Sequence, residues 1–348
     1  MESEKNGILF GGNLVVDRVK IIDVFPKRGT LVNILSQDRS TGGAPLNNSI
    51  NIKALDPRMK VAVLGCIGDD EDGRFVRNAL RRYKINPQHI KVTDLPTSFT
   101  DVFTEKKNGA RTFFHCRGAN VKWGYDDIDF AQFAHFRIVH IGYILILDAM
   151  DAEDSKYGTV LARTFAKFRS LGVKTAVDVV SDLSGDFKKK VTAALKYTDY
   201  LILNEIEAGE TTGIQARDHR DVIIKDNVVK AAERLLNMSE TTEIVVIHTP
   251  EGACGIVRGD GPVWVDSFRV PPEHIKGTAG AGDAFASGIL YALHEHKPLE
   301  EAMRLAHGMA ARCLYSTTCT GGAVSLNAIK AFMKRVAAGS TSNYRARK

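Results

Sequence analysis

Residues 277–285 read GTAGAGDAF, a glycine-rich turn that leads into a helical pattern of apolar residues. The helix is expected to begin at the turn formed by Gly280, Ala281 and Gly282. Backbone N–H groups at a helix start have no partner inside the helix, and the helix dipole adds roughly half a positive charge there. Glycine also lets a ligand approach the backbone closely. The turn is therefore a predicted anion hole, and Asp283 is a carboxylate directly beside it.

Neither of the two common phosphate-binding fingerprints fits this turn. A Walker A loop ends in Gly-Lys-Ser/Thr, and a Gly-x-Gly-x-x-Gly motif starting at Gly280 needs glycine where Phe285 stands. The segment by itself leaves two roles open for Asp283. It is either a functional carboxylate beside the anion hole or a residue that only caps the helix.

Outward from this turn, short apolar runs alternate with helical patterns along the chain. The runs are continuously apolar, as in VAVLGCI (61–67), which is typical of strands buried on both faces. This alternation predicts an α/β fold with helices on both faces of a mainly parallel sheet. Strands are expected near 7–11, 60–67, 137–142, 173–178, 199–203, 243–248 and 253–257, and helices near 45–55, 72–84, 155–171, 185–196, 205–212, 227–237, 283–295 and 299–314.

Two segments do not follow this alternation, residues 14–35 and 97–117. In the second, Asn108-Gly109 joins two strand-like runs, which is a strong signal for a type I′ hairpin. We expect the two segments to form a small β-sheet that projects from the main sheet as a lid; edge strands of the main sheet are the alternative. The chain has no low-complexity linker, so residues 1–340 are predicted to form a single domain and 341–348 a basic flexible tail.

Polar residues gather where the predicted strands end, which is the ligand-binding edge of a parallel sheet. Asn204 ends one strand and Glu207 follows three residues later, so both lie on one side of a helix start. An amide and a carboxylate in that position can organise hydrated Mg²⁺ near a phosphate, or they can simply cap the helix.

A second glycine element, STGGAPLNNS (40–49), precedes a helical run near the N-terminus. Side-chain amides beside a close backbone approach suit hydroxyl-rich ligands, because each hydroxyl is both a donor and an acceptor. The candidate residues for such a ligand are Gly42, Gly43 and Asn47, together with the upstream acid Asp17.

Composition excludes several classes of protein. The net charge is +6 over 348 residues, and the one basic cluster is the C-terminal NYRARK, so we expect no nucleic-acid partner. No run approaches the roughly 18 apolar residues of a membrane helix, and the N-terminus lacks the apolar region of a signal peptide. The five cysteines are widely spaced without a C-x-x-C pair, which predicts reduced thiols, no zinc site and a cytoplasmic location.

Four motifs, in this order, resemble the ribokinase-like (PfkB) sugar kinase family over nearly the whole chain, from FGGNLVVD to TGGAVSL. GGAPLNNS is similar to the family's N-terminal glycine–asparagine signature, and LGCIGDDEDGRF to its Gly-x-x-Gly-x-Asp-x-x-Gly stretch. LNEIEA resembles its Asn-x-x-Glu motif, and GTAGAGDAFASG resembles its C-terminal signature. The resemblance implies a three-layer α/β/α sandwich with a β lid, and transfer of the ATP γ-phosphate to a hydroxyl of a ketose, a ketodeoxy sugar acid or ribose.

The resemblance also implies roles for the candidate residues. Asp283 is implied to be the catalytic base, beside the Gly280–Gly282 anion hole. The implied substrate contacts are Asp17, Gly42, Gly43 and Asn47, and the implied nucleotide or phosphate contacts are Asn204, Glu207, Thr278 and His307. Glu207 is implied to hold Mg²⁺ indirectly through water. The expected cofactors are therefore ATP and Mg²⁺, and the lid is expected to form a homodimer.

The sequence departs from the family pattern in ways that leave three points open. Gly277 stands where the family usually has an aspartate of a monovalent-cation loop, so activation by K⁺ is in question. HTPEGA (248–253) replaces a common Thr-x-Gly-x-x-Gly, so the adenine contacts differ. Arg117 either binds an acidic substrate group or is a solvated strand residue. A nucleoside kinase, with the lid phenylalanines stacked on a base, and a catalytically silent sugar- or nucleotide-binding regulatory protein are the alternative functions.

Overall fold

The computed structural model describes residues 5–107, 109–180 and 187–345. Its main sheet has nine strands in the order β15-β14-β13-β12-β11-β8-β1-β4-β5. All neighbours pair in parallel except at one edge, where β14 pairs antiparallel with β13 and β15. The strands are β1 (Ile8–Gly12), β4 (Val61–Gly68), β5 (Ile90–Thr93), β8 (Ile138–Ile144), β11 (Lys174–Val179), β12 (Tyr200–Asn204), β13 (Ile244–His248), β14 (Gly252–Val257) and β15 (Val263–Asp266).

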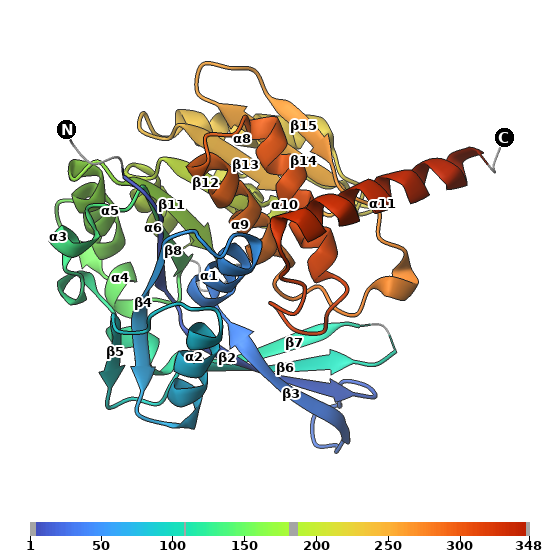
Figure 1. The fold of residues 1–348 in the computed structure, drawn as a ribbon, viewed down its shortest axis with the longest axis horizontal. Coiled ribbons are helices and arrows are strands. Elements are labelled where there is room, and N and C mark those ends of the chain that lie inside the picture. The colour runs from blue at the N-terminus through green and yellow to red at the C-terminus, as the bar shows by residue number, and fades with distance from the viewer. Residues whose placement is uncertain (1–4, 108, 181–186, 346–348) are drawn as a thin grey trace.

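Helices cover both faces of this sheet, which confirms the predicted α/β class (Figure 1). One apolar core lies between the sheet and α1, α9 and α10, and a second lies between the sheet and α5 to α8. The longer helices are α1 (Ala44–Leu55), α2 (Glu71–Arg82), α5 (Val160–Ser170), α6 (Phe187–Leu195), α7 (Glu205–Thr212), α8 (Lys225–Asn237), α9 (Ala281–His294), α10 (Leu299–Cys313) and α11 (Leu326–Arg345). None of the described helices is long and apolar enough to cross a membrane.

The elements of the structure differ from the predicted ones in several places. The helix expected from residue 155 begins at Val160, because the preceding residues form a small hairpin of β9 (Glu153–Asp154) and β10 (Gly158–Thr159), and Thr159 caps the helix. The short strands β5 and β15 were missed. Residues 341–345 of the predicted tail belong to α11, and its last three residues lie outside the described part of the chain.

The two irregular segments form a separate four-stranded sheet that projects from the body and is here called the lid (Figure 1). Its strands are β2 (Val15–Ile22), β3 (Ile34–Gly42), β6 (Phe99–Glu105) and β7 (Arg111–Cys116), in the order β3-β2-β6-β7. The alternative of edge strands on the main sheet was therefore wrong. The lid also extends beyond residue 35, because the polar run SQDRST belongs to β3. Of the predicted Asn108-Gly109 turn, Asn108 lies outside the described residues.

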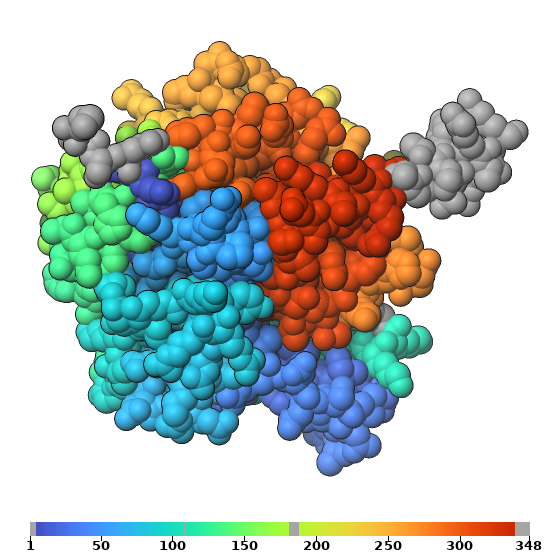
Figure 2. All heavy atoms as spheres, in the orientation of Figure 1, coloured from blue at the N-terminus to red at the C-terminus, as the bar shows by residue number. Residues whose placement is uncertain are grey.

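The connections of the lid determine where a ligand can lie. β2 follows the end of β1 after two residues, and β3 leads directly into α1. Figure 2 shows the lid as a lobe beneath the body, with the C-terminal part of the chain beside it. The space between the lid, α1 and the start of α9 therefore lies at the carboxyl ends of β1 and β8, where open parallel sheets bind ligands.

Candidate active site

Asp283 lies in the first turn of α9 with both carboxylate oxygens hydrogen-bonded. Asn47 Nδ2 donates to Oδ2 at 2.8 Å, and the Tyr143 hydroxyl donates to Oδ1 at 2.8 Å. Burial raises the pKa of Asp283, and these two hydrogen bonds lower it. The carboxylate does not cap α9, since no side chain caps that helix. The capping interpretation of Asp283 was therefore wrong.

The elements that hold Asp283 meet at close backbone contacts. Gly43, the residue before α1, has φ 81°, and a Cβ there would lie 2.0 Å from the carbonyl oxygen of Asn13. Asn13 accepts a hydrogen bond from the Tyr143 backbone N–H at 2.6 Å through its Oδ1. Asn13, which follows β1, thus contacts both the start of α1, which carries Asn47, and the backbone of Tyr143 on β8. These contacts position Asn47 and Tyr143 relative to Asp283.

The predicted anion hole has the geometry of an open helix start. Gly280 precedes α9 with φ 76°, where a Cβ would lie 2.5 Å from the Cys319 carbonyl oxygen, so this position requires glycine. The Ala281 N–H bonds back to Thr278 O at 3.3 Å, whereas the N–H groups of Gly282 and Asp283 have no backbone partner among the described residues. Gly282 is exposed, and the nearest atom to a Cβ there would be His248 Cε1 at 3.8 Å. The free N–H of Gly282 therefore lies at an open position, with that of Asp283 next to it in the chain.

Asp17 lies on the lid strand β2, at the opposite side of the same space. A Cβ on Gly42 would lie 2.4 Å from Asp17 Oδ1, so glycine is needed for the carboxylate to fit. Cys319 Sγ donates to Asp17 Oδ2 at 3.4 Å. Burial raises the pKa of Asp17 to about 7; the Cys319 hydrogen bond lowers it, and the negative charge of Asp283 raises it. The structure therefore brings Asp17, Gly42 and Asp283 together.

Thr278 contacts the lid directly, because the Arg111 guanidinium of β7 donates to its hydroxyl. His307 differs from the other candidates: its Nε2 lies 3.1 Å from the Val265 carbonyl oxygen, and its ring packs edge-on against Phe285. Burial lowers the pKa of His307 to about 4, so it is neutral at pH 7. Its described contacts are those of a core residue.

Asn204 and Glu207 form the reciprocal cap of α7, as one of the two interpretations predicted. The Asn204 side chain accepts from the Ile206 and Glu207 N–H groups, and both Glu207 carboxylate oxygens accept from Asn204. Burial raises the pKa of Glu207. Burial also raises the pKa of Asp178, and the negative charge of Glu207 raises it further. Glu207 is buried and Asp178 is partly buried, and no salt bridge joins either one to a cationic side chain among the described residues. Such a pair of carboxylates fits a hydrated divalent metal. No cluster of three metal-binding side chains occurs among the described residues, so such an ion would need water and phosphate oxygens as further ligands.

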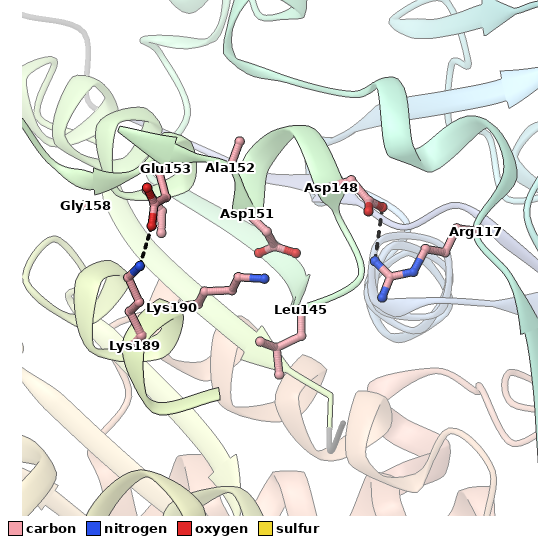
Figure 3. A pocket seen from close by; sticks show the side chains of 10 residues that line it. Arg117, Leu145, Asp148, Asp151, Ala152, Glu153, Gly158, Lys189 and Lys190 are labelled. Carbon is pink, nitrogen blue, oxygen red and sulfur yellow. Dashed lines mark hydrogen bonds and ion pairs between the residues drawn. The ribbon is translucent and has the colours of Figure 1, made fainter. Parts of the chain in front are cut away.

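A pocket of about 370 Å³ lies beside β8, lined by residues that include Arg117, Asp148, Glu153 and Lys189 (Figure 3). Arg117 pairs with Asp148 at 3.1 Å, and Lys189 pairs with Glu153. Each of these two ion pairs is neutral. Arg117 lines this pocket, whereas the residues predicted to form the anion hole and the nucleotide and sugar contacts do not. The Arg117 side chain is 40% exposed, as expected for the solvated alternative, and it pairs with Asp148.

Sequence reasoning missed Tyr143, Arg111 and Cys319. Tyr143 lies near the end of a predicted strand, so the rule that ligands bind at strand ends could have indicated it. The sequence did not indicate Arg111, because an arginine on a strand is usually solvated. Cys319 gave no signal, since only the folded chain brings it to Asp17.

Known proteins of one family resemble this chain over most of its length. Residues 12–325 match the pfkB family carbohydrate kinase profile. A fructokinase from Klebsiella pneumoniae is 26% identical over 77% of this chain and 82% of its own length, and an adenosine kinase from Schizosaccharomyces pombe is 25% identical over 79% of each. The structure of Arabidopsis thaliana ribokinase with ribose and ATP superimposes with a TM-score of 0.76 at 20% identity, covering 95% of this chain and 99% of that one. The chain therefore belongs to the pfkB family of carbohydrate kinases.

Proposed function

We propose that this family member is an ATP-dependent sugar kinase that transfers the γ-phosphoryl group to a hydroxyl of a small carbohydrate. One observation carries the proposal: a buried carboxylate, Asp283, lies directly beside free N–H donors at the start of α9. Phosphoryl transfer needs fixed donors for the charge on the moving group and a separate acceptor for the proton of the attacking hydroxyl. This turn places both within one helix start.

In this mechanism Asp283 accepts the proton of the attacking hydroxyl. Asn47 and Tyr143 hold its two oxygens, so the carboxylate cannot rotate away from the acceptor. The same hydrogen bonds favour the ionised form and oppose part of the rise in pKa that burial causes. The N–H groups of Gly282 and Asp283 donate hydrogen bonds to the phosphoryl oxygens and stabilise the negative charge that builds there.

Glu207 and Asp178, with Asn204, are the residues that would hold Mg²⁺ through water. The ion would supply neutralisation of the phosphate charge when bound. The lid would cover the acceptor and exclude water, which otherwise competes for the phosphoryl group. Asp17 and Gly42, at the base of the lid, are proposed to bind acceptor hydroxyls.

A sugar is favoured over a nucleoside by the polar residues around the acceptor space. Asp17 and Asn47 are hydrogen-bonding groups, whereas Phe114 of the lid packs against Phe25 and Phe103. A nucleoside kinase remains the second candidate, since an adenosine kinase is among the relatives. A silent binding protein is disfavoured because Asp283 and its two hydrogen-bond partners are all present.

The test is an ATP-consumption screen of neutral ketoses, ribose, sugar acids and nucleosides, each with and without K⁺. We expect turnover with a sugar or sugar acid, and little dependence on K⁺ because Gly277 offers no carboxylate for a cation. Turnover with nucleosides alone would instead favour the second candidate. Binding of Mg·ATP without turnover on any acceptor would favour the silent binder.

The predicted homodimer is proposed to form through the lid, which carries a set of exposed apolar side chains: Val24, Phe25, Leu31, Ile34, Leu35, Phe113 and Phe114. We expect light scattering to give about twice the 38.2 kDa monomer mass. Leu31→Glu, at a side chain that is 87% exposed, should yield monomers without loss of folding, whereas Val222→Glu, outside the lid, should not. A monomeric wild-type protein would refute the proposal.

A further inference from the structure

The turn that follows α10, residues 314–322, places Cys319 between the start of α9 and the lid. Cys319 is buried, and a Cβ on Gly280 would lie 2.5 Å from its carbonyl oxygen and 2.6 Å from its Cα. The Cys313 thiol donates to the same carbonyl oxygen at 3.5 Å and to the carbonyl oxygen of Ala279 at 3.3 Å. The backbone of Cys319 is therefore fixed against the residues that begin the anion hole.

The side chain of Cys319 reaches the lid. Its Sγ donates to Oδ2 of Asp17 on β2 at 3.4 Å, across 302 positions of the chain. Burial and the negative charges of Asp17 and Asp283 raise the pKa of the Cys319 thiol, so it stays protonated at neutral pH and remains a donor. One thiol thus joins the rigid start of α9 to the carboxylate at the base of the lid.

The two carboxylate oxygens of Asp17 differ in their surroundings. Oδ2 accepts from the thiol, whereas Oδ1 accepts no hydrogen bond among the described residues. Asp17 is partly exposed, and Oδ1 is not one of the fully enclosed polar atoms. The missing side chain of Gly42 leaves space beside it, since a Cβ there would lie 2.4 Å from Oδ1. Oδ1 is therefore the oxygen that is left for a hydroxyl donor.

The next residue of the turn approaches the other residue proposed to bind the acceptor. Oγ1 of Thr320 lies 3.4 Å from Oγ1 of Thr41 on β3, and the Thr41 hydroxyl donates to Oδ1 of Asn47 at 3.3 Å. Consecutive residues of one turn therefore reach Asp17 directly and Asn47 through Thr41. Because the same turn packs on Gly280, it relates the acceptor side of the cleft to the anion hole.

We propose that Cys319 is a positioning residue for the acceptor: its thiol holds Oδ2 of Asp17, so that Oδ1 faces an acceptor hydroxyl. This inference rests on the proposed kinase function, in which Asp17 binds the acceptor. Without the thiol, the carboxylate loses its one described donor and can rotate about its Cβ–Cγ bond. The acceptor then has to order a carboxylate that the wild-type protein holds ready, and this cost appears in acceptor binding.

The kinetic test compares Cys319→Ala and Cys319→Ser with Cys254→Ala. Serine keeps a hydrogen-bond donor at the position, whereas alanine removes it. Cys254 is the matched control because its thiol is also buried but lies on β14 in an apolar core. Steady-state rates are measured with ribose and with fructose as acceptors, and the concentrations of acceptor and ATP are varied separately.

We expect Cys319→Ala to raise KM for the acceptor about 10-fold, to change kcat less than about 3-fold and to leave KM for ATP unchanged. Cys319→Ser should recover part of the loss, and Cys254→Ala should behave as wild type. An unchanged KM for the acceptor in Cys319→Ala would overturn the inference. So would an equal loss in the alanine and serine variants, because a packing defect does not depend on a donor.

The pH dependence gives a second readout that loss of packing would not move. Burial raises the pKa of Asp17 to about 7, and the groups that act on it are Cys319 on the turn, Asp283 on α9 and Arg111 on β7. The thiol lowers this pKa, so Cys319→Ala raises it, and the acidic limb of kcat/KM for the acceptor should move to higher pH. The limb of kcat, which reports the complex with bound acceptor, should stay in place. An unmoved kcat/KM limb would contradict the inference.

A measurement without substrate separates this inference from the proposed function. Carbon-13 NMR follows the titration of the Asp17 carboxyl group in wild type and in Cys319→Ala, and Asp17→Asn identifies its signal. A wild-type protein that phosphorylates no acceptor would refute the kinase proposal, while a higher pKa of Asp17 in Cys319→Ala would still support the thiol contact. Equal pKa values in the two proteins would overturn the inference about Cys319 even in an active kinase.

Discussion

Asp283→Asn is expected to lower kcat by about 10²- to 10⁴-fold while the protein stays folded. The substitution keeps the size of the side chain but removes the proton acceptor. It should not lower the melting temperature at pH 7. Burial raises the pKa of Asp283 in the folded protein above its unfolded value, so the ionised carboxylate costs folding free energy at neutral pH, and asparagine removes that cost. The measurements are single-turnover rates and thermal unfolding of both proteins.

Tyr143→Phe gives an independent check on the same role. Its hydroxyl donates to Asp283 Oδ1 and so lowers the pKa of the carboxyl group. Removing that hydrogen bond raises the pKa, so the acidic limb of the kcat/KM profile should move to higher pH. An unmoved limb, together with near-normal turnover of Asp283→Asn, would show that Asp283 is not the base.

Gly282→Ala is expected to lower kcat/KM for ATP by about 10²-fold or more, because the new methyl group enters the space where the phosphate must approach the helix start. The protein itself has room for it, since the nearest atom is His248 Cε1 at 3.8 Å. Alanine is also the better helix former, so unfolding should need slightly more free energy, by about 0.5–1 kcal/mol. Activity and stability should therefore change in opposite directions.

Substitutions at two other glycines serve as controls for this experiment. Gly261→Ala, where a Cβ would have no neighbour within 4 Å, should change neither activity nor stability. Gly280→Ala should destabilise the loop, because its Cβ would lie 2.5 Å from the Cys319 carbonyl oxygen. If Gly282→Ala binds ATP as wild type does, the helix start is not the anion hole. Calorimetry with ATP and with the sugar locates the loss on the donor side.

The main sheet was predictable because its strands are buried on both faces, so their apolar runs are continuous. β3 was partly missed for the opposite reason: its run SQDRST is polar, and most of its first half is exposed. The carboxylate of Asp283 was predictable from its position at a glycine turn. Its partner Tyr143 was not, because the contact joins residues 140 positions apart and depends on how β8 meets α9. His307 was singled out by its position in a motif, while its described contacts are with β15 and Phe285.

The way the lid joins the body has a mechanical consequence. All four of its strands meet the body at one end: β2 begins there at Val15, β3 ends there at Gly42, β6 begins there at Phe99 and β7 ends there at Cys116. A stiff sheet that turns about that end displaces its free end the most. Asp17 lies near the pivot and keeps its distance to Asp283, whereas Arg111 lies at the free end and swings furthest. Opening the lid would therefore separate Arg111 from Thr278 first and leave Asp17 beside Asp283.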